Sequence, residues 1–203
     1  MNIGVLGFQG DVQEHIDMLK RISRRVRDLK AVHIRRASDL DSVNGLIIPG
    51  GESTTIYKLS VEYGLYSRIM ERSSEGMPIM ATCAGLILVS KNTNDDRVKG
   101  MGLLDVTIRR NAYGRQVMSF ETDIDINGIG NFPAVFIRAP VIEDPGRSEV
   151  LGTLDGRPVI VRQNNVLGMT FHPELTGDTR VHEYFVNMVW GRGGYISTAE
   201  MKR

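Results

Sequence analysis

Short apolar runs alternate with amphipathic segments through the first 91 residues, and this alternation restricts the chain to a few architectures. Residues 2–7, 31–35, 45–49 and 78–82 are each long enough for one buried strand. Between the first two runs, residues 12–30 carry apolar side chains every three or four positions, which is typical of one face of a helix. Strands that alternate with helices at this spacing form βαβ units around a largely parallel sheet.

The second half of the chain has more strand signals than helix signals. After further helices at residues 54–59, 65–72 and 84–91, strands are expected at 106–110, 117–126, 134–138, 150–154, 158–162 and 166–171. Asp155 and Gly156 predict a hairpin with a type I′ turn. In a final helix at 181–190, the inward residues would be Val181, Phe185 and Val189, with Met188 beside them. The sequence therefore predicts one α/β domain of residues 1–190, with antiparallel strands added in its second half, and a loose tail of residues 191–203.

The first long helix begins with a capping signal and carries a basic face. Asp11 with Glu14 three residues later resembles a capping box, in which side chains bond the first free backbone N–H groups. Basic residues lie largely on the polar side of this helix: Lys20, Arg21, Arg24, Arg25, Arg27 and Lys30. They form either a solvated face or a docking surface for a partner protein. Nucleic acid is not expected there, because no aromatic residues alternate with these charges.

Composition excludes several classes of protein. Of 203 residues, 41% are hydrophobic, which is enough for a core and too apolar for a disordered chain. Basic residues number 25 and acidic residues 24, and the net charge of +1 argues against a large nucleic-acid footprint or a polybasic membrane anchor. No run reaches ~18 apolar residues, and no secretion signal is visible. The single cysteine can form neither an internal disulfide nor a Cys-rich zinc site, so a reducing, cytoplasmic location is expected.

Cys83 stands where a predicted strand gives way to a helix, with the small residues Ala81 and Gly85 two positions away on either side. This order is the pattern of a nucleophile elbow, whose turn is too tight for bulky neighbours. At a helix N-terminus the unpaired N–H groups and the helix dipole favour the thiolate, the reactive form of cysteine. A lone cysteine is more often a small buried apolar residue, but this setting favours a catalytic nucleophile.

His172 is the histidine that has an acidic companion, Glu174, two residues away. In an extended segment the two side chains point to the same side, and Pro173 restricts His172 to an extended conformation. A carboxylate on one ring nitrogen fixes the tautomer and leaves the other nitrogen to activate a thiol. The remaining histidines lack such a companion: His15 and His33 have none, and His182 is expected on the surface of the last helix.

Gly50 and Gly51 follow the apolar run at 45–49 and precede Glu52. Two glycines let the backbone adopt unusual angles and bring its N–H groups close to a ligand. Such a loop can form an oxyanion hole, which binds the charge that develops on a tetrahedral intermediate. A phosphate-binding loop is disfavoured because the Walker lysine is absent, and an ordinary strand-to-helix turn is the remaining alternative.

These segments make the chain similar to the class I (triad) glutamine amidotransferases. Residues 82–86, around Cys83, and residues 171–174, around His172, mark that group. Within it, the chain resembles the PdxT/SNO family, the glutaminase subunits of pyridoxal 5′-phosphate synthase, through residues 3–10, 46–55, 110–116, 136–140 and 171–176. The resemblance implies a three-layer, flavodoxin-like α/β fold with a central, mostly parallel sheet.

The resemblance also implies roles for individual residues. It implies Cys83 as the nucleophile, His172 as base and acid, and Glu174 as the group that orients His172. The glutamine pocket would be lined by Gly50, Gly51, Glu52, Arg110, Ile137 and Arg138. Arginines suit this pocket because a guanidinium binds the α-carboxylate of glutamine with paired hydrogen bonds. The backbone N–H groups of Gly51 and Ala84 would form the oxyanion hole.

The implied reaction is the hydrolysis of L-glutamine to L-glutamate and ammonia through a thioester on Cys83, with no metal or organic cofactor. Ammonia would pass to a synthase subunit of the PdxS/SNZ type in a large hetero-oligomeric complex, which makes pyridoxal 5′-phosphate from a pentose phosphate and a triose phosphate. The resemblance further implies low activity until the synthase docks and reorients the Gly50–Gly51 backbone. Two alternatives stay open: a glutaminase that serves a different synthase or acts alone, and a non-catalytic regulatory module on the same fold.

Overall fold

The computed structural model describes residues 1–110 and 119–191. Residues 111–116, which form most of one predicted family segment, lie outside the described residues. Residues 192–203 of the predicted tail also lie outside them. No helix in the described ranges is both long enough and apolar enough to cross a membrane.

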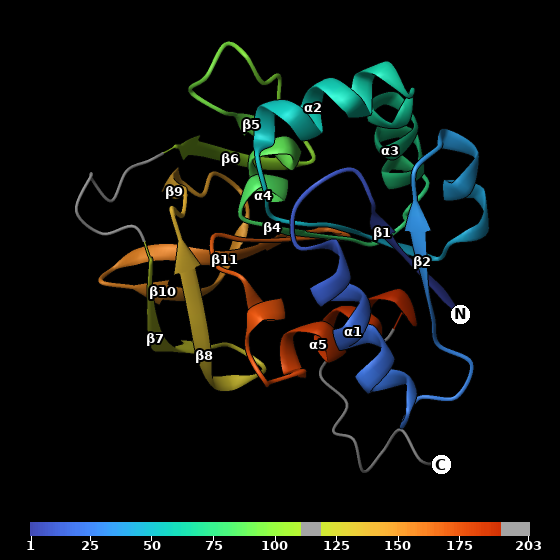
Figure 1. The fold of residues 1–203 in the computed structure, drawn as a ribbon. Coiled ribbons are helices and arrows are strands. Elements are labelled where there is room, and N and C mark those ends of the chain that lie inside the picture. The colour runs from blue at the N-terminus through green and yellow to red at the C-terminus, as the bar shows by residue number, and fades with distance from the viewer. Residues whose placement is uncertain (111–118, 192–203) are drawn as a thin grey trace.

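A nine-stranded sheet forms the centre of the molecule (Figure 1). Its strands are β1 (Asn2–Leu6), β2 (Lys30–Ile34), β3 (Gly45–Ile48), β4 (Ile79–Thr82), β7 (Ser119–Ile126), β8 (Gly130–Ile137), β10 (Glu149–Leu154), β11 (Arg157–Gln163) and β12 (Val166–Met169). They lie in the order β2-β1-β3-β4-β12-β11-β10-β7-β8. The strands from β2 to β12 pair in parallel, and those from β12 through β11, β10 and β7 to β8 pair antiparallel. The predicted division into a parallel first half and an antiparallel addition is therefore confirmed.

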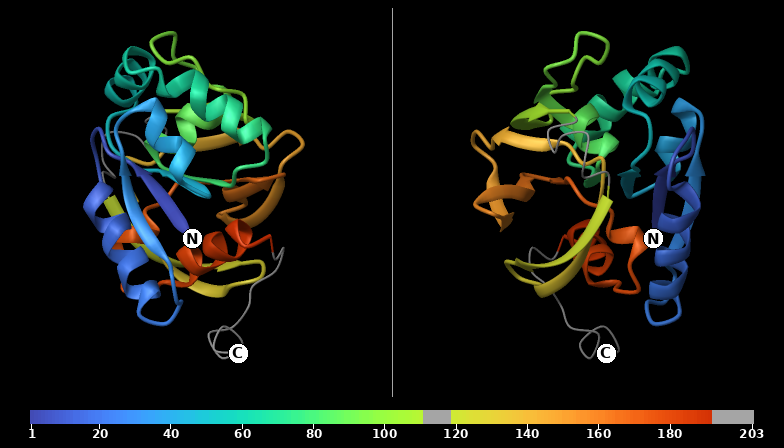
Figure 2. Two further views of the ribbon diagram at one scale, coloured as in Figure 1. Left: turned by 90° about the vertical axis from the view of Figure 1, so that its right-hand side faces the viewer. Right: turned by 60° about the vertical axis from the view of Figure 1, so that its left-hand side comes forward.

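Helices cover both faces of this sheet and complete three layers. On one face lie α1 (Val12–Ser23) and α5 (Arg180–Val189), and on the other α2 (Ser53–Glu62), α3 (Leu65–Ser74) and α4 (Ala84–Val89). Figure 2 shows the β7–β8 hairpin, in yellow, curving beside α5, in red. Alternate residues of each strand enter the two cores: Ile47 faces the α1 side, whereas Leu46 and Ile48 face the α2 side. The α/β class is confirmed.

The predicted hairpin is present between β10 and β11. Asp155 and Gly156 connect them with φ values of 49° and 75°. Positive φ at both central positions is what a type I′ turn requires. The dipeptide therefore has the positive φ values that its sequence predicts.

The first helix is shorter than predicted, because α1 ends at Ser23 and not near residue 30. Asp28 has a φ of 67°, which an α-helix cannot accommodate. The Lys30 N–H donates to the Met1 carbonyl over 2.9 Å, and the Met1 amino group donates to the Asp28 carbonyl over 2.7 Å. Pairing of β2 with β1 thus ends the helix early, while Val26 and Leu29 keep their buried positions in the connecting turns.

A small second sheet was not predicted. It consists of β5 (Ser90–Asn92), β6 (Leu104–Arg109) and β9 (Val141–Asp144), in that order. The helix predicted to reach residue 91 ends at Val89. The N–H groups of residues 101–103 donate to the carbonyls of residues 88–90. Pairing with this later segment therefore ends the helix, although local propensity would continue it.

Candidate functional site

Cys83 lies at a sharp turn between β4 and α4. Its backbone has φ 47° and ψ −103°, outside the regions that a residue with a side chain normally adopts. The Cys83 N–H donates to the Met169 carbonyl of β12 over 2.9 Å, which ties the turn to the sheet. A Cβ atom at Gly85 would lie 2.1 Å from the Ile48 carbonyl oxygen, so only glycine fits there. Strain held in this way is typical of functional sites.

A cavity of about 380 Å³ opens beside Cys83. This volume lies at the small end of the ~300–1,000 Å³ typical of small-molecule sites. Its lining residues come from segments far apart in the chain: Gln9, Gly10, Asp11, Gly51, Glu52, Ser53, Cys83, Ala84, Ile87, Arg110, Ile137, Arg138, Pro140 and His172. Of the predicted site residues, Gly50 and Glu174 are not in this lining. Gly50 packs against His172, where a Cβ atom would lie 2.4 Å from Cε1, and Glu174 lies behind the imidazole.

His172 and Glu174 contact each other, but not through the extended segment that the sequence suggested. His172 is followed by a 3-10 turn, η2 (Pro173–Leu175), which contains Glu174. Glu174 Oε1 lies 2.7 Å from His172 Nδ1, and both residues are buried. The His172 N–H donates to the Val135 carbonyl of β8 over 2.8 Å. The proline therefore acts by starting a tight turn, and the pairing of the two side chains is the same.

The environment of His172 favours its protonated form. Burial alone would lower the pKa of His172, but the contacts of its Nδ1 with Asp11 and Glu174, together with the charge of the Cys83 sulfur, outweigh it and raise the pKa to about 12. Burial in turn raises the pKa of Glu174, against the opposing hydrogen bond from His172. An imidazolium in contact with the cavity can stabilise a thiolate and later donate a proton.

Asp11 is a member of this cluster that the sequence did not reveal. The predicted capping box is wrong: Asp11 precedes α1, but its side chain makes no capping hydrogen bond. Its Oδ2 lies 3.2 Å from His172 Nδ1 instead, and this hydrogen bond lowers the pKa of Asp11. An Asp that precedes a helix is typical of an N-cap, and no nearby residue indicates that its partner is His172, 161 positions away.

Two histidine predictions are also wrong. His182 is completely buried on α5, where a surface position was expected. His15, expected to have no companion, lies 2.9 Å from His182 through Nδ1 and Nε2, and its Nε2 lies 3.4 Å from Glu174 Oε2. Both contacts join residues more than 150 positions apart, so the spacing of the sequence carries no sign of them.

The glycine loop contacts the loop that precedes α1. Gly51 has a φ of 144°, and the Glu52 N–H that follows it donates to Gln9 Oε1 over 2.7 Å. The Glu52 carboxylate accepts hydrogen bonds from Thr54 and Thr55 at the start of α2, and these bonds lower its pKa to about 2 against the effect of burial. Gln9 is a further residue of the cavity to which the sequence gave no role.

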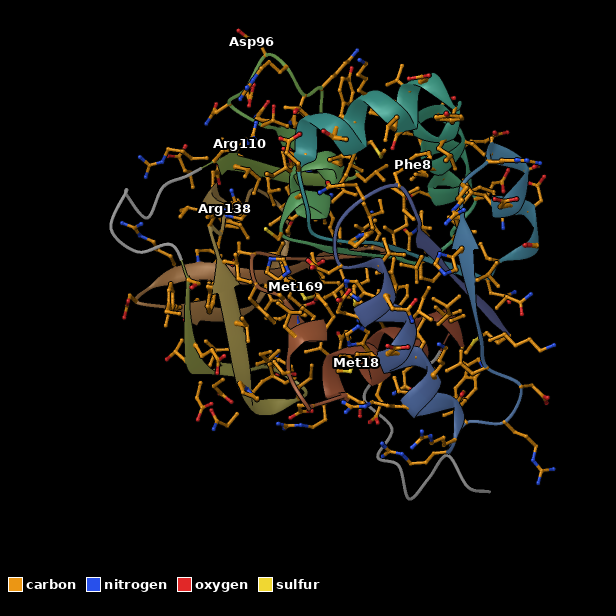
Figure 3. All side chains as sticks on the ribbon, viewed as in Figure 1. Phe8, Met18, Asp96, Arg110, Arg138 and Met169 are labelled. Atoms are coloured by element: carbon orange, nitrogen blue, oxygen red, sulfur yellow. The ribbon has the colours of Figure 1, made fainter. Side chains whose placement is uncertain are left out.

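Two arginines form the charged side of the cavity. Figure 3 shows Arg110 and Arg138 near each other, beside the ends of β6 and β8. Arg110 forms ion pairs with Asp95 and, over 3.4 Å, with Glu52 Oε1. Arg138 is exposed and has a φ of 42°, and the described part of the chain contains no ion pair to its guanidinium. The cavity can therefore offer a cation to an anionic group.

A cation could in principle contact the acidic cluster around His172. Ligand atoms of Asp11, His172 and Glu174 lie within 4.8 Å of one another. However, the histidine atom that faces both carboxylates is Nδ1, which donates its proton to Glu174. A metal would have to replace that proton, so the geometry fits a proton-bearing histidine better than a metal ligand.

Comparisons with known proteins agree with this geometry. The chain is 81% identical over 203 residues to the pyridoxal 5′-phosphate synthase subunit PdxT of Thermoplasma acidophilum, with all of both chains covered. It is 68% identical to the Thermoplasma volcanium protein of the same name, over 98% of this chain and 99% of the relative. A crystal structure described as a glutamine amidotransferase superposes with a TM-score of 0.86 at 44% identity, over 93% of this chain and 98% of that one. The model of the SNO glutamine amidotransferase family matches residues 5–190, and the chain belongs to this family.

Proposed function

We propose that this protein is the glutaminase subunit of a pyridoxal 5′-phosphate synthase. The observation that carries the proposal is the convergence of Cys83, on its strained turn, and His172, backed by Glu174, on one small cavity. Relatives that carry the PdxT name align over the full chain, which supports the same assignment. The protein hydrolyses L-glutamine to L-glutamate and ammonia.

The reaction begins when the Cys83 thiolate attacks the side-chain amide carbon of glutamine. The carbonyl oxygen takes up the negative charge, and the N–H groups of Gly51 and Ala84 hold it. One such donor is worth about 10²–10³ in rate. His172 gives its proton to the leaving nitrogen, which departs as ammonia and leaves a γ-glutamyl thioester. His172 then takes a proton from water, the hydroxide attacks the thioester, and glutamate and the thiolate are released.

Glutamine is held by the charged side of the cavity. The guanidinium of Arg138 binds the α-carboxylate, with Arg110 beside it. Glu52 holds Arg110 in place and faces the substrate's ammonium group. The backbone of Ile137 and the Gly50–Gly51 loop complete the pocket around the side chain of the substrate.

The ammonia passes to a synthase subunit of the PdxS/SNZ type within a hetero-oligomer. That subunit joins it to a pentose phosphate and a triose phosphate to make pyridoxal 5′-phosphate. Docking reorients the Gly50–Gly51 backbone, so the isolated glutaminase has low activity. The strained cysteine and its paired histidine favour a working enzyme over a regulatory module, because a module has no need of either.

The decisive experiment measures ammonia release with and without the synthase subunit, for the wild type and for Cys83→Ala. The wild type should be stimulated by the synthase, and Cys83→Ala should release no ammonia while it still folds and still binds the synthase. Substantial turnover by Cys83→Ala would overturn the assignment of the nucleophile. Stimulation by a different synthase, and not by this one, would overturn the assignment of the pathway.

A further inference from the structure

Two buried histidines lie behind the catalytic pair and take no part in the reaction described above. His15, on α1, and His182, on α5, both have 0% of their surface exposed. His15 Nδ1 lies 2.9 Å from His182 Nε2, and the two ring centroids are 5.2 Å apart. Burying polar rings costs free energy unless they form hydrogen bonds, so the positions of their protons can be worked out from their partners.

His15 connects this pair to the catalytic site. Its Nε2 lies 3.4 Å from Glu174 Oε2 and 3.3 Å from the hydroxyl oxygen of Thr82, the residue before Cys83. Glu174 Oε2 is the carboxylate oxygen that His172 does not use. Within the described residues that buried oxygen has no hydrogen-bond partner, and His15 Nε2, which contacts the Thr82 hydroxyl, is the nitrogen that approaches it.

The partners of the two rings select one arrangement of protons. Glu174, paired with the His172 imidazolium, is ionised and offers only acceptors, while the Thr82 hydroxyl can accept as well as donate. His15 therefore carries its proton on Nε2, because a lone pair there would face the carboxylate. His15 Nδ1 is then an acceptor, and His182 must donate to it from Nε2. That leaves His182 Nδ1 without a proton, and this buried atom has no hydrogen-bond partner in the described structure. The opposite arrangement would bury an unpaired N–H at His182 and direct two acceptors at each other.

Both rings are neutral in this environment. Burial, and then repulsion from the positive charges that His182 and His172 carry when protonated, hold the pKa of His15 well below its ordinary value. Burial lowers the pKa of His182 to about 3. A neutral donor can orient the Glu174 carboxylate without cancelling its charge, whereas a lysine or arginine in the same place would compete with His172 for it.

We propose that His15 is a positioning residue for Glu174: its Nε2–H holds the second carboxylate oxygen, and His182 fixes the tautomer that supplies this proton. His182 donates to His15, and His15 donates to one carboxylate oxygen of Glu174. His172 donates to the other oxygen. Glu174 is thereby held from both sides. The inference rests on the proposed glutaminase function.

The titratable groups that face His182, His15 and Glu174 come from four parts of the fold. Asp11 comes from the start of α1, Cys83 from the turn after β4, and His172 and Glu174 from the segment around η2. From α5, His182 faces His15, while the neighbouring Glu183 faces Arg25, 3.6 Å away. Any pH-dependent readout must therefore be referred to these groups.

The first test observes the protons directly. Long-range ¹H–¹⁵N correlation spectra of the wild-type protein distinguish Nε2–H from Nδ1–H tautomers of histidine. Both His15 and His182 should be Nε2–H and neutral between about pH 6 and pH 8. A proton on His15 Nδ1, or a charged His15 in this range, would overturn the proposal.

The second test compares two substitutions that differ in one donor. The amide nitrogen of glutamine can occupy the place of histidine Nε2, so His15→Gln keeps the donor to Glu174, whereas His15→Leu removes it. In the complex with the synthase, His15→Leu should lower kcat about tenfold to a hundredfold, by analogy with the loss of groups that orient metal-binding histidines. KM should stay unchanged, and His15→Gln should recover most of the loss.

Alkylation of Cys83 by iodoacetamide supplies a readout that packing alone would not move. Without the donor, Glu174 stabilises the His172 imidazolium less well, and the pH at half-maximal alkylation should rise in His15→Leu but not in His15→Gln. His33→Leu, at an exposed histidine of β2, is the control. Equal losses in the Leu and Gln variants, with an unmoved alkylation profile in both, would show that His15 only fills space.

The two hypotheses fail in different ways. If Cys83→Ala retained glutaminase turnover, the proposed function would fall, while the tautomers of His15 and His182 would still be those observed by NMR. If Cys83→Ala were inactive but His15→Leu turned over at the wild-type rate, only the role of His15 would be refuted.

Discussion

The two sides of the cavity are built in opposite ways. Cys83, His172 and Glu174 are 8%, 4% and 5% exposed, and each follows a strand of the parallel part of the sheet. On the other side, the side chains of Glu52 and Arg110 are 46% and 20% exposed and belong to loops. We call the first group the reaction side and the second, together with Arg138, the recognition side.

The difference fits the roles that we propose for the two sides. A nucleophile and its proton donor need fixed geometry and little water, because charges interact strongly only where solvent is excluded. Groups that recognise a charged amino acid must stay solvated or paired while the cavity is empty, since an unpaired buried charge is too costly. Changes on the reaction side should therefore lower kcat, and changes on the recognition side should raise KM.

The largest effect is expected for Glu174→Gln on the reaction side. The amide keeps the shape of the carboxylate but cannot stabilise the imidazolium of His172 with a negative charge. By analogy with other catalytic triads, kcat for ammonia release should fall by about 10⁴, with little change in KM. Glu149→Gln, at an exposed position on β10, is the matched control. A loss of less than tenfold would mean that Glu174 is not the orienting acid.

The next effect is expected for Gly85→Ala, which adds one carbon next to the turn of Cys83. The new Cβ atom would lie 2.1 Å from the Ile48 carbonyl oxygen, so the backbone must move. Overpacking of this kind lowers the free energy of unfolding by about 1–3 kcal/mol. Moving a reacting group by about 1 Å costs on the order of 10² in rate, so kcat should fall as well.

Gly177→Ala provides the control for that experiment, because a Cβ atom there meets nothing within 4 Å. Its free energy of unfolding, measured with urea, and its kcat for ammonia release should both be close to those of the wild type. If Gly85→Ala matched it in both measurements, the tight packing of the turn would not be needed for activity.

On the recognition side, Arg138→Met should raise KM and leave kcat within a few-fold of the wild type. A hydrogen bond to a charged group is worth about 1.5–3 kcal/mol, which corresponds to roughly a tenfold to hundredfold change in KM. Arg157→Met, at an exposed position on β11, should change neither constant. A fall in kcat with KM unchanged would move Arg138 from recognition to reaction.

The sequence predicted the parts of this molecule whose causes are local. The apolar runs are the strands β1 to β4, the Asp155–Gly156 turn has the predicted geometry, and the α/β fold and the family are confirmed. The strands and the turn depend on residues within about ten positions of one another, and the α/β class and the family follow from the order of such local segments along the chain. Where local preference and tertiary pairing disagree, as at the end of α1, the pairing decides.

The residues that the sequence missed share a different property. Asp11, His15 and His182 have their important contacts between 67 and 167 positions away. Nearly all of α5 is buried, so its polar residues cannot be assigned to a solvent face by periodicity. Polar side chains that break a local rule mark the neighbourhood of the site, and they can be interpreted only once the fold has brought their partners together.

The smallest predicted effect is that of Asp11→Asn, which tests whether the reaction side extends to the start of α1. Because the pKa of Asp11 is lowered, its contact with His172 stabilises the folded protein fully at pH values above 3.8, its ordinary pKa. This stabilisation is lost as the pH falls through the lowered pKa. The pKa of His172 is raised to about 12, so the stability that its protonated form contributes is fully present below pH 6.5 and is lost as the pH rises toward 12. The free energy of unfolding of the wild type should therefore exceed that of Asp11→Asn by about 1 kcal/mol at neutral pH.

Urea unfolding at a series of pH values measures this difference. The difference should stay constant from neutral pH down to about 4, shrink as the pH falls below 3.8 and Asp11 takes up a proton, and shrink again at strongly alkaline pH as His172 loses one. Asp125→Asn, at an exposed carboxylate of β7, should show no such pattern. A difference between wild type and Asp11→Asn that did not change as the pH fell well below 3.8 would mean that the ionised Asp11 carboxylate does not stabilise the imidazolium. The reaction side would then not extend to Asp11.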